Sequence, residues 1–188
     1  MARSPFVYDT RELGRRPGSM REHRIEAAAP EGWGLDLVKV AAGTPVAIDA
    51  RFESVMDGVL VTAEVEVAVS AECGRCLDPV ELGLVVPVQE LYAYEPDPDD
   101  PDALTLSGDT LDLEPVVRDA VVLALPMNPL CDPDCPGLCA TCGARLADVE
   151  PDHGHEEVDP RWAALALLKD GSTPSRGQPA QPHTSEES

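Results

Sequence analysis

The stretch that decides the fold is DGVLVTAEVEVAVSAECGRCLDPVELGLVVPV, residues 57–88. From position 59 to 69, every second residue is valine or alanine, and Thr62, Glu64 and Glu66 occupy three of the five positions between them. This period of two predicts an antiparallel strand with one buried and one wet face. A second alternation follows Pro79, so CGRCLDP is predicted to connect two antiparallel strands, with Cys73 on the apolar side. Asp57-Gly58 predicts a hairpin to the preceding strand.

The neighbouring segments extend this pattern in both directions. The segments GLDLVKV, residues 34–40, and PVAIDARF, residues 45–52, have the character of strands. Residues 111–126 carry apolar side chains at three- and four-residue spacing and predict a helix that Pro126 ends. Residues 159–170 predict a second helix, with Asp159 as its cap. The predicted class is α+β, an antiparallel β-rich core with one or two packed helices and a zinc-tied C-terminal extension.

The length of 188 residues favours one compact domain with tails. We expect that domain at residues 31–170. It would comprise a β-rich part at 31–94, an acidic loop at 95–110 and a helix with a Cys/His segment at 111–170. Residues 1–30 are predicted to be a basic N-terminal arm, and residues 171–188 a disordered tail of low complexity.

Charge limits the classes of partner. The net charge is −21, which argues against simple tight binding to nucleic acid because that requires Lys and Arg to replace phosphate counterions. Residues 1–24 have a net charge of +3, and the remainder carries −24. The alternative that the basic segment is merely a solvated surface stays open. Its candidates for RNA contact are Arg11, Arg15, Arg16, Arg21 and Arg24.

The chain contains no apolar run that approaches the roughly 18–20 residues needed to cross a bilayer. Its first residues lack the apolar core of a secretion signal. We therefore expect a cytoplasmic protein with no membrane partner. Cysteines stay reduced in that compartment, so clustered cysteines favour a metal over disulfides.

Six cysteines and two clustered histidines supply enough donors for two tetrahedral zinc ions. Two CxxC pairs are present, in CGRC and CATC, and each can place two thiolates on one metal. The candidate ligands are Cys73, Cys76, Cys131, Cys135, Cys139, Cys142, His153 and His155.

Two groupings of these ligands are open. One combines the two CxxC pairs and leaves the other donors for a second site. The other, which we prefer, joins Cys73 and Cys76 to Cys131 and Cys135. Cys139 and Cys142 then bind with His153 and His155 across a short connection that costs little chain entropy to close. The histidines could instead belong to an exposed acidic loop. Either site would be structural, because protein ligands fill all four positions.

The chain resembles the YceD family, which is named for accumulation of the large ribosomal RNA subunit. The resemblance is carried by VAVSAECGRCLDPVE (residues 67–81), LALPMNPLCDPDCPGLCATCGARL (123–146) and EEVDPRWAALALLKD (156–170). The segment FVYDTRELGRRPGSM (6–20) resembles the start of actinobacterial members. Some family members keep the first CxRC pair and a second pair near Cys131 and Cys135 but lack the GLCxxCG pair, which supports the preferred grouping. Others carry Cys-x-Cys at the position of His153 and His155.

The resemblance implies a role in synthesis, processing or stability of large-subunit ribosomal RNA, with no known enzymatic activity. It also implies a small, basic large-subunit ribosomal protein or a pre-ribosomal particle as partner. Two alternatives are a direct RNA-binding zinc module and a metal-dependent nuclease acting on precursor ribosomal RNA. The sequence contains no HExxH motif and no P-loop, and it has no evident Ser-His-Asp order.

Overall fold

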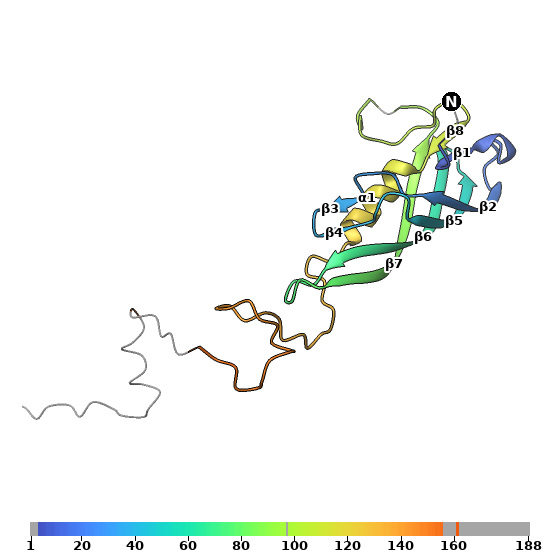
Figure 1. Ribbon diagram of the computed structural model, residues 1–188. Coiled ribbons are helices and arrows are strands. Elements are labelled where there is room, and N and C mark those ends of the chain that lie inside the picture. The colour runs from blue at the N-terminus through green and yellow to red at the C-terminus, as the bar shows by residue number, and fades with distance from the viewer. Residues whose placement is uncertain (1–3, 97, 156–160, 162–188) are drawn as a thin grey trace, which may run out of the picture. The chain divides into compact units, whose positions relative to one another are not determined.

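Two long antiparallel strands joined by the CGRC turn form the centre of the fold (Figure 1). The computed structural model describes residues 4–96, 98–155 and 161. It divides into two units, Met1–Asp148 and Val149–Ser188, and each is described by itself. The helices and strands of the described residues lie in the first unit: β1 (Val7–Asp9), the 3-10 helix η1 (Thr10–Glu12), β2 (Met20–Ala28), β3 (Gly34–Leu35), β4 (Val38–Lys39), β5 (Pro45–Ser54), β6 (Gly58–Glu72), β7 (Pro79–Ala93), β8 (Thr110–Asp112) and α1 (Glu114–Ala124).

Strand β6 organises a six-stranded antiparallel sheet. It pairs with β7 along its whole length, from Gly58↔Ala93 to Glu72↔Pro79. Its other edge is shared: β5 pairs with residues 59–67, and β4 pairs with residues 70–71. Strand β2 lies outside β5, and β1 pairs with β8 in a separate two-stranded sheet. The predicted strand pair and its CGRCLDP connection are confirmed.

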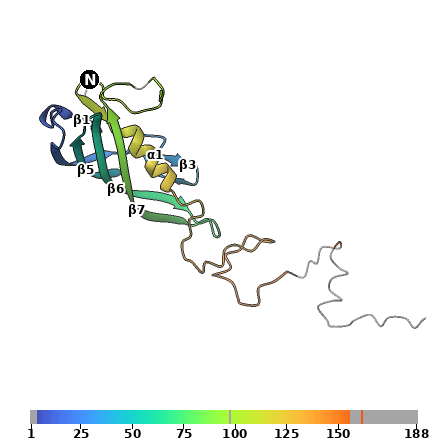
Figure 2. The same ribbon diagram turned by 180° about the vertical axis from the view of Figure 1, so that it is seen from behind.

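The core forms on the valine face of β6, as the alternation predicts. Val61, Val65 and Val69 are completely buried there. Helix α1 lies beside β7 in both ribbon views and buries Val117 and Val121 (Figures 1 and 2). This arrangement of antiparallel sheets with one packed helix in the described residues confirms the α+β class.

Residues 4–30, predicted to belong to a basic N-terminal arm, are packed on the sheet. Strand β2 pairs with β5 from Met20↔Glu53 to Ala28↔Pro45, and Phe6 and Leu13 are buried in the core. Only Ile25 of β2 is buried. An edge strand with a largely exposed surface has no apolar alternation to reveal it, so the charged sequence MREHRIEAA gave no strand signal.

Two other expectations have different outcomes. Residues 34–40 do not form one strand: β3 and β4 pair as a small hairpin, Gly34↔Lys39 and Leu35↔Val38. The helix predicted at 111–126 is confirmed as α1 over Glu114–Ala124, whereas residues 111–112 belong to strand β8. Its first turn is supported by the carboxylate of Asp112, which accepts from the backbone N–H of Glu114 at 3.0 Å.

The predicted helix at 159–170 and tail at 171–188 lie outside the described residues, apart from residue 161. Within the described part of the chain, helical segments fall short of the length and apolarity that a bilayer crossing requires.

Candidate metal centre

Four cysteine sulfurs converge where the β6–β7 turn meets the segment that follows α1. Cys73 and Cys76 come from the turn, and Cys131 and Cys135 come from the later segment. The four Sγ atoms all lie within 4.8 Å of one another. The Sγ atoms of Cys73 and Cys135 are 3.9 Å apart, and those of Cys76 and Cys131 are 3.5 Å apart. This is the preferred grouping of the first four ligands.

The backbone of the turn shapes the first half of the cluster. The N–H of Cys73 donates to the carbonyl of Asp78 at 2.8 Å, and the N–H of Leu77 donates to the carbonyl of Cys73 at 2.9 Å. Leu77 has a φ of 62°, in the left-handed region that residues other than glycine rarely occupy. The turn thus folds back tightly enough to aim Cys73 and Cys76 at one point.

Contacts that involve no sulfur hold the second half against the turn. The N–H of Gly74 donates to the carbonyl of Pro129 at 2.8 Å. The guanidinium of Arg75 donates to the carbonyls of Cys135 at 2.8 Å and Pro133 at 3.2 Å. Arg145 forms an ion pair with Asp78. Sequence patterns gave no role to Arg75, although its place inside the CxxC pair put it next to the ligands.

The electrostatics of the cluster favour one thiolate and oppose another. Backbone N–H groups of Cys76, Cys131 and Arg75 lower the pKa of the Cys73 thiol to about 6. Desolvation, together with hydrogen bonds to the neighbouring cysteines, raises the pKa of Cys76 to about 12. Four adjacent thiols cannot all ionise without a compensating cation. A divalent metal would supply that charge, because metal binding releases the thiol protons.

The donor set fits zinc. Tetrahedral zinc with Zn–S bonds of about 2.3 Å places its sulfurs about 3.8 Å apart, close to the separations in this cluster. Cys73 and Cys135 are buried, whereas Cys131 is exposed. Four protein thiolates would fill a tetrahedral shell, so this set matches a structural site rather than a catalytic one with an open position.

The other four candidate ligands are divided between the two units of the chain, two in each. In the first unit, Cys139 and Cys142 flank a tight turn in which the N–H of Gly143 donates to the carbonyl of Cys139 at 2.8 Å. In the second unit, the rings of His153 and His155 lie edge to face with centroids 4.9 Å apart. The union of these halves on one ion stays a prediction.

The strained turn residue gives a test of the local geometry. Leu77→Gly is expected to raise the free energy of unfolding by up to about 1 kcal/mol, because the left-handed conformation costs an L-residue about 1–2 kcal/mol. The Leu77 side chain is 59% exposed, so little packing is lost. Urea unfolding of the zinc-loaded protein measures the change. Leu37→Gly, at an equally exposed position, is the control and should not stabilise the protein; destabilisation by Leu77→Gly would contradict this reading of the turn.

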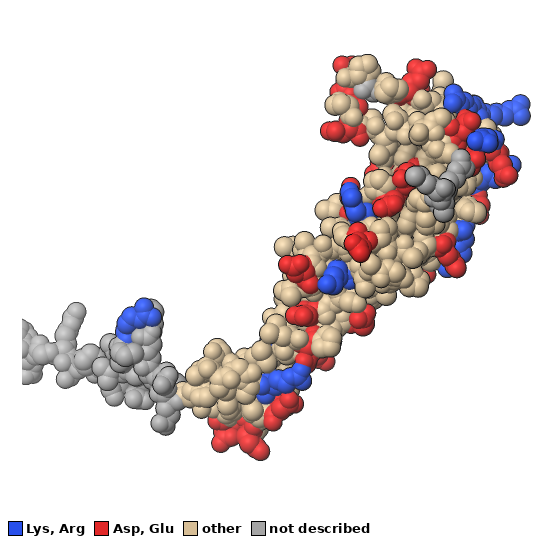
Figure 3. Space-filling model, turned by 45° about the horizontal axis from the view of Figure 1, so that its top comes forward, with Lys and Arg blue, Asp and Glu red and all other residues tan. Residues whose placement is uncertain are grey.

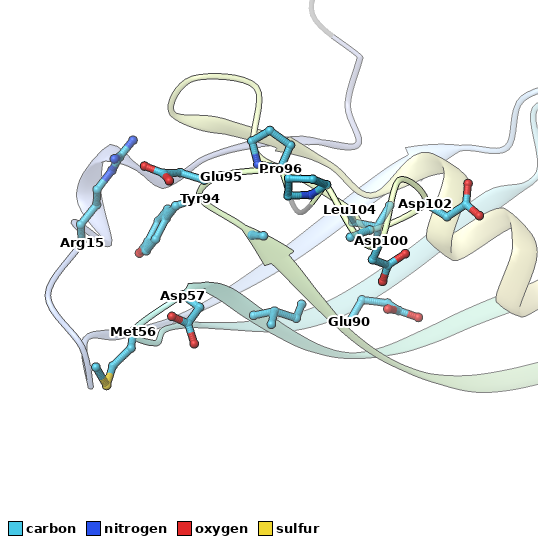
Figure 4. Close-up of a pocket in the computed structure, with 14 residues that line it drawn as sticks. Arg15, Met56, Asp57, Glu90, Tyr94, Glu95, Pro96, Asp100, Asp102 and Leu104 are labelled. Carbon is cyan, nitrogen blue, oxygen red and sulfur yellow. The ribbon is translucent and has the colours of Figure 1, made fainter.

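A second notable feature is an acidic hollow of about 1050 Å³ beneath the loop that follows β7. Arg15 lies over the ring of Tyr94, 4.9 Å from its centroid, at one end of the hollow (Figure 4). The carboxylates that line the hollow are those of Asp57, Glu90, Glu95, Asp100 and Asp102.

The arginines expected to contact RNA are partly engaged within the protein. Arg11 and Arg15 lie 3.7 and 3.9 Å from Asp109, and Arg24 lies 2.6 Å from Asp49. Arg21 donates to the carbonyl of Met20. Contact of these side chains and Arg16 with RNA stays a prediction.

Known proteins resemble this chain over the region that contains the cysteine cluster. Residues 61–169 match the family model described as large ribosomal RNA subunit accumulation protein YceD. An uncharacterized protein of Mycobacterium tuberculosis is 43% identical over 187 residues, covering 93% of this chain and 87% of the relative. A chloroplastic protein of Zea mays, named large ribosomal RNA subunit accumulation protein YCED homolog 1, is 23% identical over 147 residues, covering 61% of this chain and 50% of the relative.

No solved structure matches the chain. The matched region spans β6 from its fourth residue, the CGRC turn, β7, α1 and all eight candidate ligands. The chain belongs to the YceD family.

Proposed function

We propose that this protein is a non-enzymatic ribosome biogenesis factor that supports synthesis, processing or stability of large-subunit ribosomal RNA in the cytoplasm. The observation that carries the proposal is family membership: the family model and the maize relative are named for accumulation of this RNA. The closed donor set of the cysteine cluster supports a structural rather than a catalytic use of metal.

Zinc is the proposed cofactor, in one or two structural ions. The first is held by Cys73, Cys76, Cys131 and Cys135, whose convergence supports it. The second is held by Cys139, Cys142, His153 and His155, and the short chain between its two halves supports this pairing. The first ion would fasten the segment after α1 to the end of the sheet, so its binding energy would be folding energy.

The proposed partner is a basic large-subunit ribosomal protein or a pre-ribosomal particle that presents one. The net charge of −21 supports this choice, because electrostatic complementarity favours a basic surface and disfavours bare RNA. The pairing of Arg11, Arg15 and Arg24 with carboxylates further reduces the positive charge available to phosphates.

Depletion of the protein tests the proposal. Mature large-subunit ribosomal RNA is expected to fall relative to small-subunit RNA, and re-expression of the unaltered chain should restore it. Quantitative northern blotting of both RNAs measures the ratio. An unchanged ratio after full depletion would count against the proposed role. Cleavage of precursor RNA by the purified protein would overturn its non-enzymatic part.

A further inference from the structure

The face of the sheet opposite the valine core is open and strongly acidic. Alternation along β2, β5, β6 and β7 directs one set of side chains away from the core, and within the described residues no element covers the middle of this set. The set contains two arginines, Arg24 and Arg51. Its acidic members are Glu22, Glu26, Asp49, Glu53, Glu64, Glu66, Glu72 and Glu81, and we refer to this surface as the acidic sheet face.

The arrangement of charge on this face only partly stabilises the fold. Strand register sets Glu22 opposite Arg51 and Arg24 opposite Asp49, but the carboxylates outnumber the arginines. Asp49 and Glu64 are directly opposite each other on β5 and β6, where like charges destabilise a sheet. Arg24 offsets part of that repulsion through its ion pairs with Asp49 and Glu26, at 2.6 and 3.5 Å. Figure 3 shows that acidic side chains, interspersed with Lys and Arg, are spread along the first unit on the side it displays. The carboxylates that exceed the two arginines of this face have no cationic cross-strand partner, and such a surplus suits a cationic partner protein.

The face is also hollowed. Small residues at Ala47, Ala68 and Gly83 leave a groove of about 590 Å³ that Glu26 and Glu66 border. A second hollow of about 580 Å³ lies next to the groove along the same strands, and Arg24, Asp49 and Glu64 contribute to its lining. Lysine and arginine bury their aliphatic stems on apolar surface while their charged heads reach polar groups. A floor of small residues with carboxylates at its rim matches both parts of such a side chain.

We propose that the acidic sheet face docks a lysine- or arginine-rich segment of a partner protein. The proposal rests on the proposed function, in which a basic protein is the partner, and it assigns the surface that receives it. Stems of the basic residues lie over Ala47, Ala68 and Gly83, and their heads pair with Glu26, Glu64 and Glu66. Charge complementarity selects this occupant, because an acidic peptide or a nucleic acid would be repelled.

Two double variants with equal charge change test the assignment. The first is Glu64→Gln/Glu66→Gln on the acidic sheet face. The control is Asp100→Asn/Asp102→Asn in the hollow near Tyr94. The probe is a short fluorescent peptide in which lysine and alanine alternate, and fluorescence anisotropy measures its dissociation constant. We expect affinity to fall about five- to tenfold for the first variant, from two lost surface ion pairs, and less than about twofold for the control.

A third variant changes shape without changing charge. A Cβ at Gly83 meets nothing within 4 Å, and its φ lies outside the left-handed region, so Gly83→Leu is compatible with the fold. The added side chain fills the groove and is expected to weaken peptide binding severalfold. The free energy of unfolding in urea should be unchanged or slightly raised. Retention of full affinity by Gly83→Leu would overturn the groove as the seat of the peptide.

The remaining outcomes also decide the matter. Equal losses in the two double variants would mean that the peptide senses only overall charge, and a loss confined to the control would assign binding to the hollow near Tyr94. Self-association that the acidic-sheet-face variants abolish would assign that face to a second copy of the chain. Each result overturns the proposal. Specific binding of the peptide, together with an unchanged level of ribosomal RNA after depletion, would support the docking surface but contradict the proposed function.

Discussion

Cys73→Ser is expected to lose one zinc ion per chain and several kilocalories per mole of folding free energy. Structural zinc contributes about 10–16 kcal/mol of apparent binding free energy near neutral pH, and a site with three thiolates keeps only part of it. Cys73 is completely buried, so the serine hydroxyl would face a desolvated set of thiols. Native mass spectrometry of the reduced protein measures the zinc content, and thermal unfolding measures the stability.

Cys142→Ser is the matched control, because it makes the same chemical change in the other proposed site. It is expected to leave the first ion bound and the amides of the CGRC turn protected from hydrogen exchange. The double variant should bind no zinc at all. If Cys73 and Cys142 shared one ion, the double variant would keep the other, and the grouping would be wrong. If the purified, reduced wild-type protein contained no zinc, both proposed zinc sites would be contradicted.

Phe52→Ala is expected to lower the free energy of unfolding by about 3–5 kcal/mol, the range for removing a fully buried aromatic side chain. Phe52 has no exposed surface at the centre of the sheet. Its ring stacks on that of Tyr8 from β1, with centroids 3.7 Å apart and planes 2° from parallel. The free energy of unfolding of a typical domain is only about 5–15 kcal/mol, so this substitution would remove a large part of it. Urea unfolding followed by circular dichroism gives the value.

Met56→Ala provides the comparison for that measurement. Met56 lies in the turn between β5 and β6 with 82% of its surface exposed, so a change within about 0.5 kcal/mol is expected. A loss below about 1 kcal/mol for Phe52→Ala would contradict the packing of β1 on the sheet. It would instead favour an unpacked form of the basic N-terminal arm that the sequence predicted for residues 1–30.

The centre of the sheet could be predicted because its signal is local. Alternation along residues 59–69 specifies which side chains of β6 are buried, and the CGRC turn specifies where the strand ends. Strand β2 could not be found in the same way, because its pairing with β5 is long-range and its edge position leaves most of its side chains exposed. The segment at 34–40 alternates like a strand, but Gly34 and the turn after Leu35 make it a hairpin.

The candidate site also has some features that the sequence predicts and others that it does not. Cysteine is rare and chemically specific, so all four cysteines of the first cluster could be predicted as candidate ligands, and the structure brings their sulfurs together. Their binding of a metal stays a prediction. The supporting contacts were not, since nothing local indicates that Arg75 reaches the carbonyl of Cys135 across 60 positions. The left-handed conformation of Leu77 was also hidden, because glycine is the usual signal for it. The acidic sheet face emerged only from strand register, which brings side chains from four strands together.

The separation of the two cysteine pairs along the chain has a topological consequence. Cys76 and Cys131 are 55 positions apart, yet their sulfurs lie side by side. A bond that closes a loop of this length removes about 4 kcal/mol of unfolded-chain entropy by the polymer estimate used for disulfides. A zinc ion at this point would restrict the unfolded chain to about the same degree as a disulfide, without needing an oxidising compartment. A chelator or a competing thiol-rich protein would open such a cross-link, with no change in the oxidation state of any cysteine.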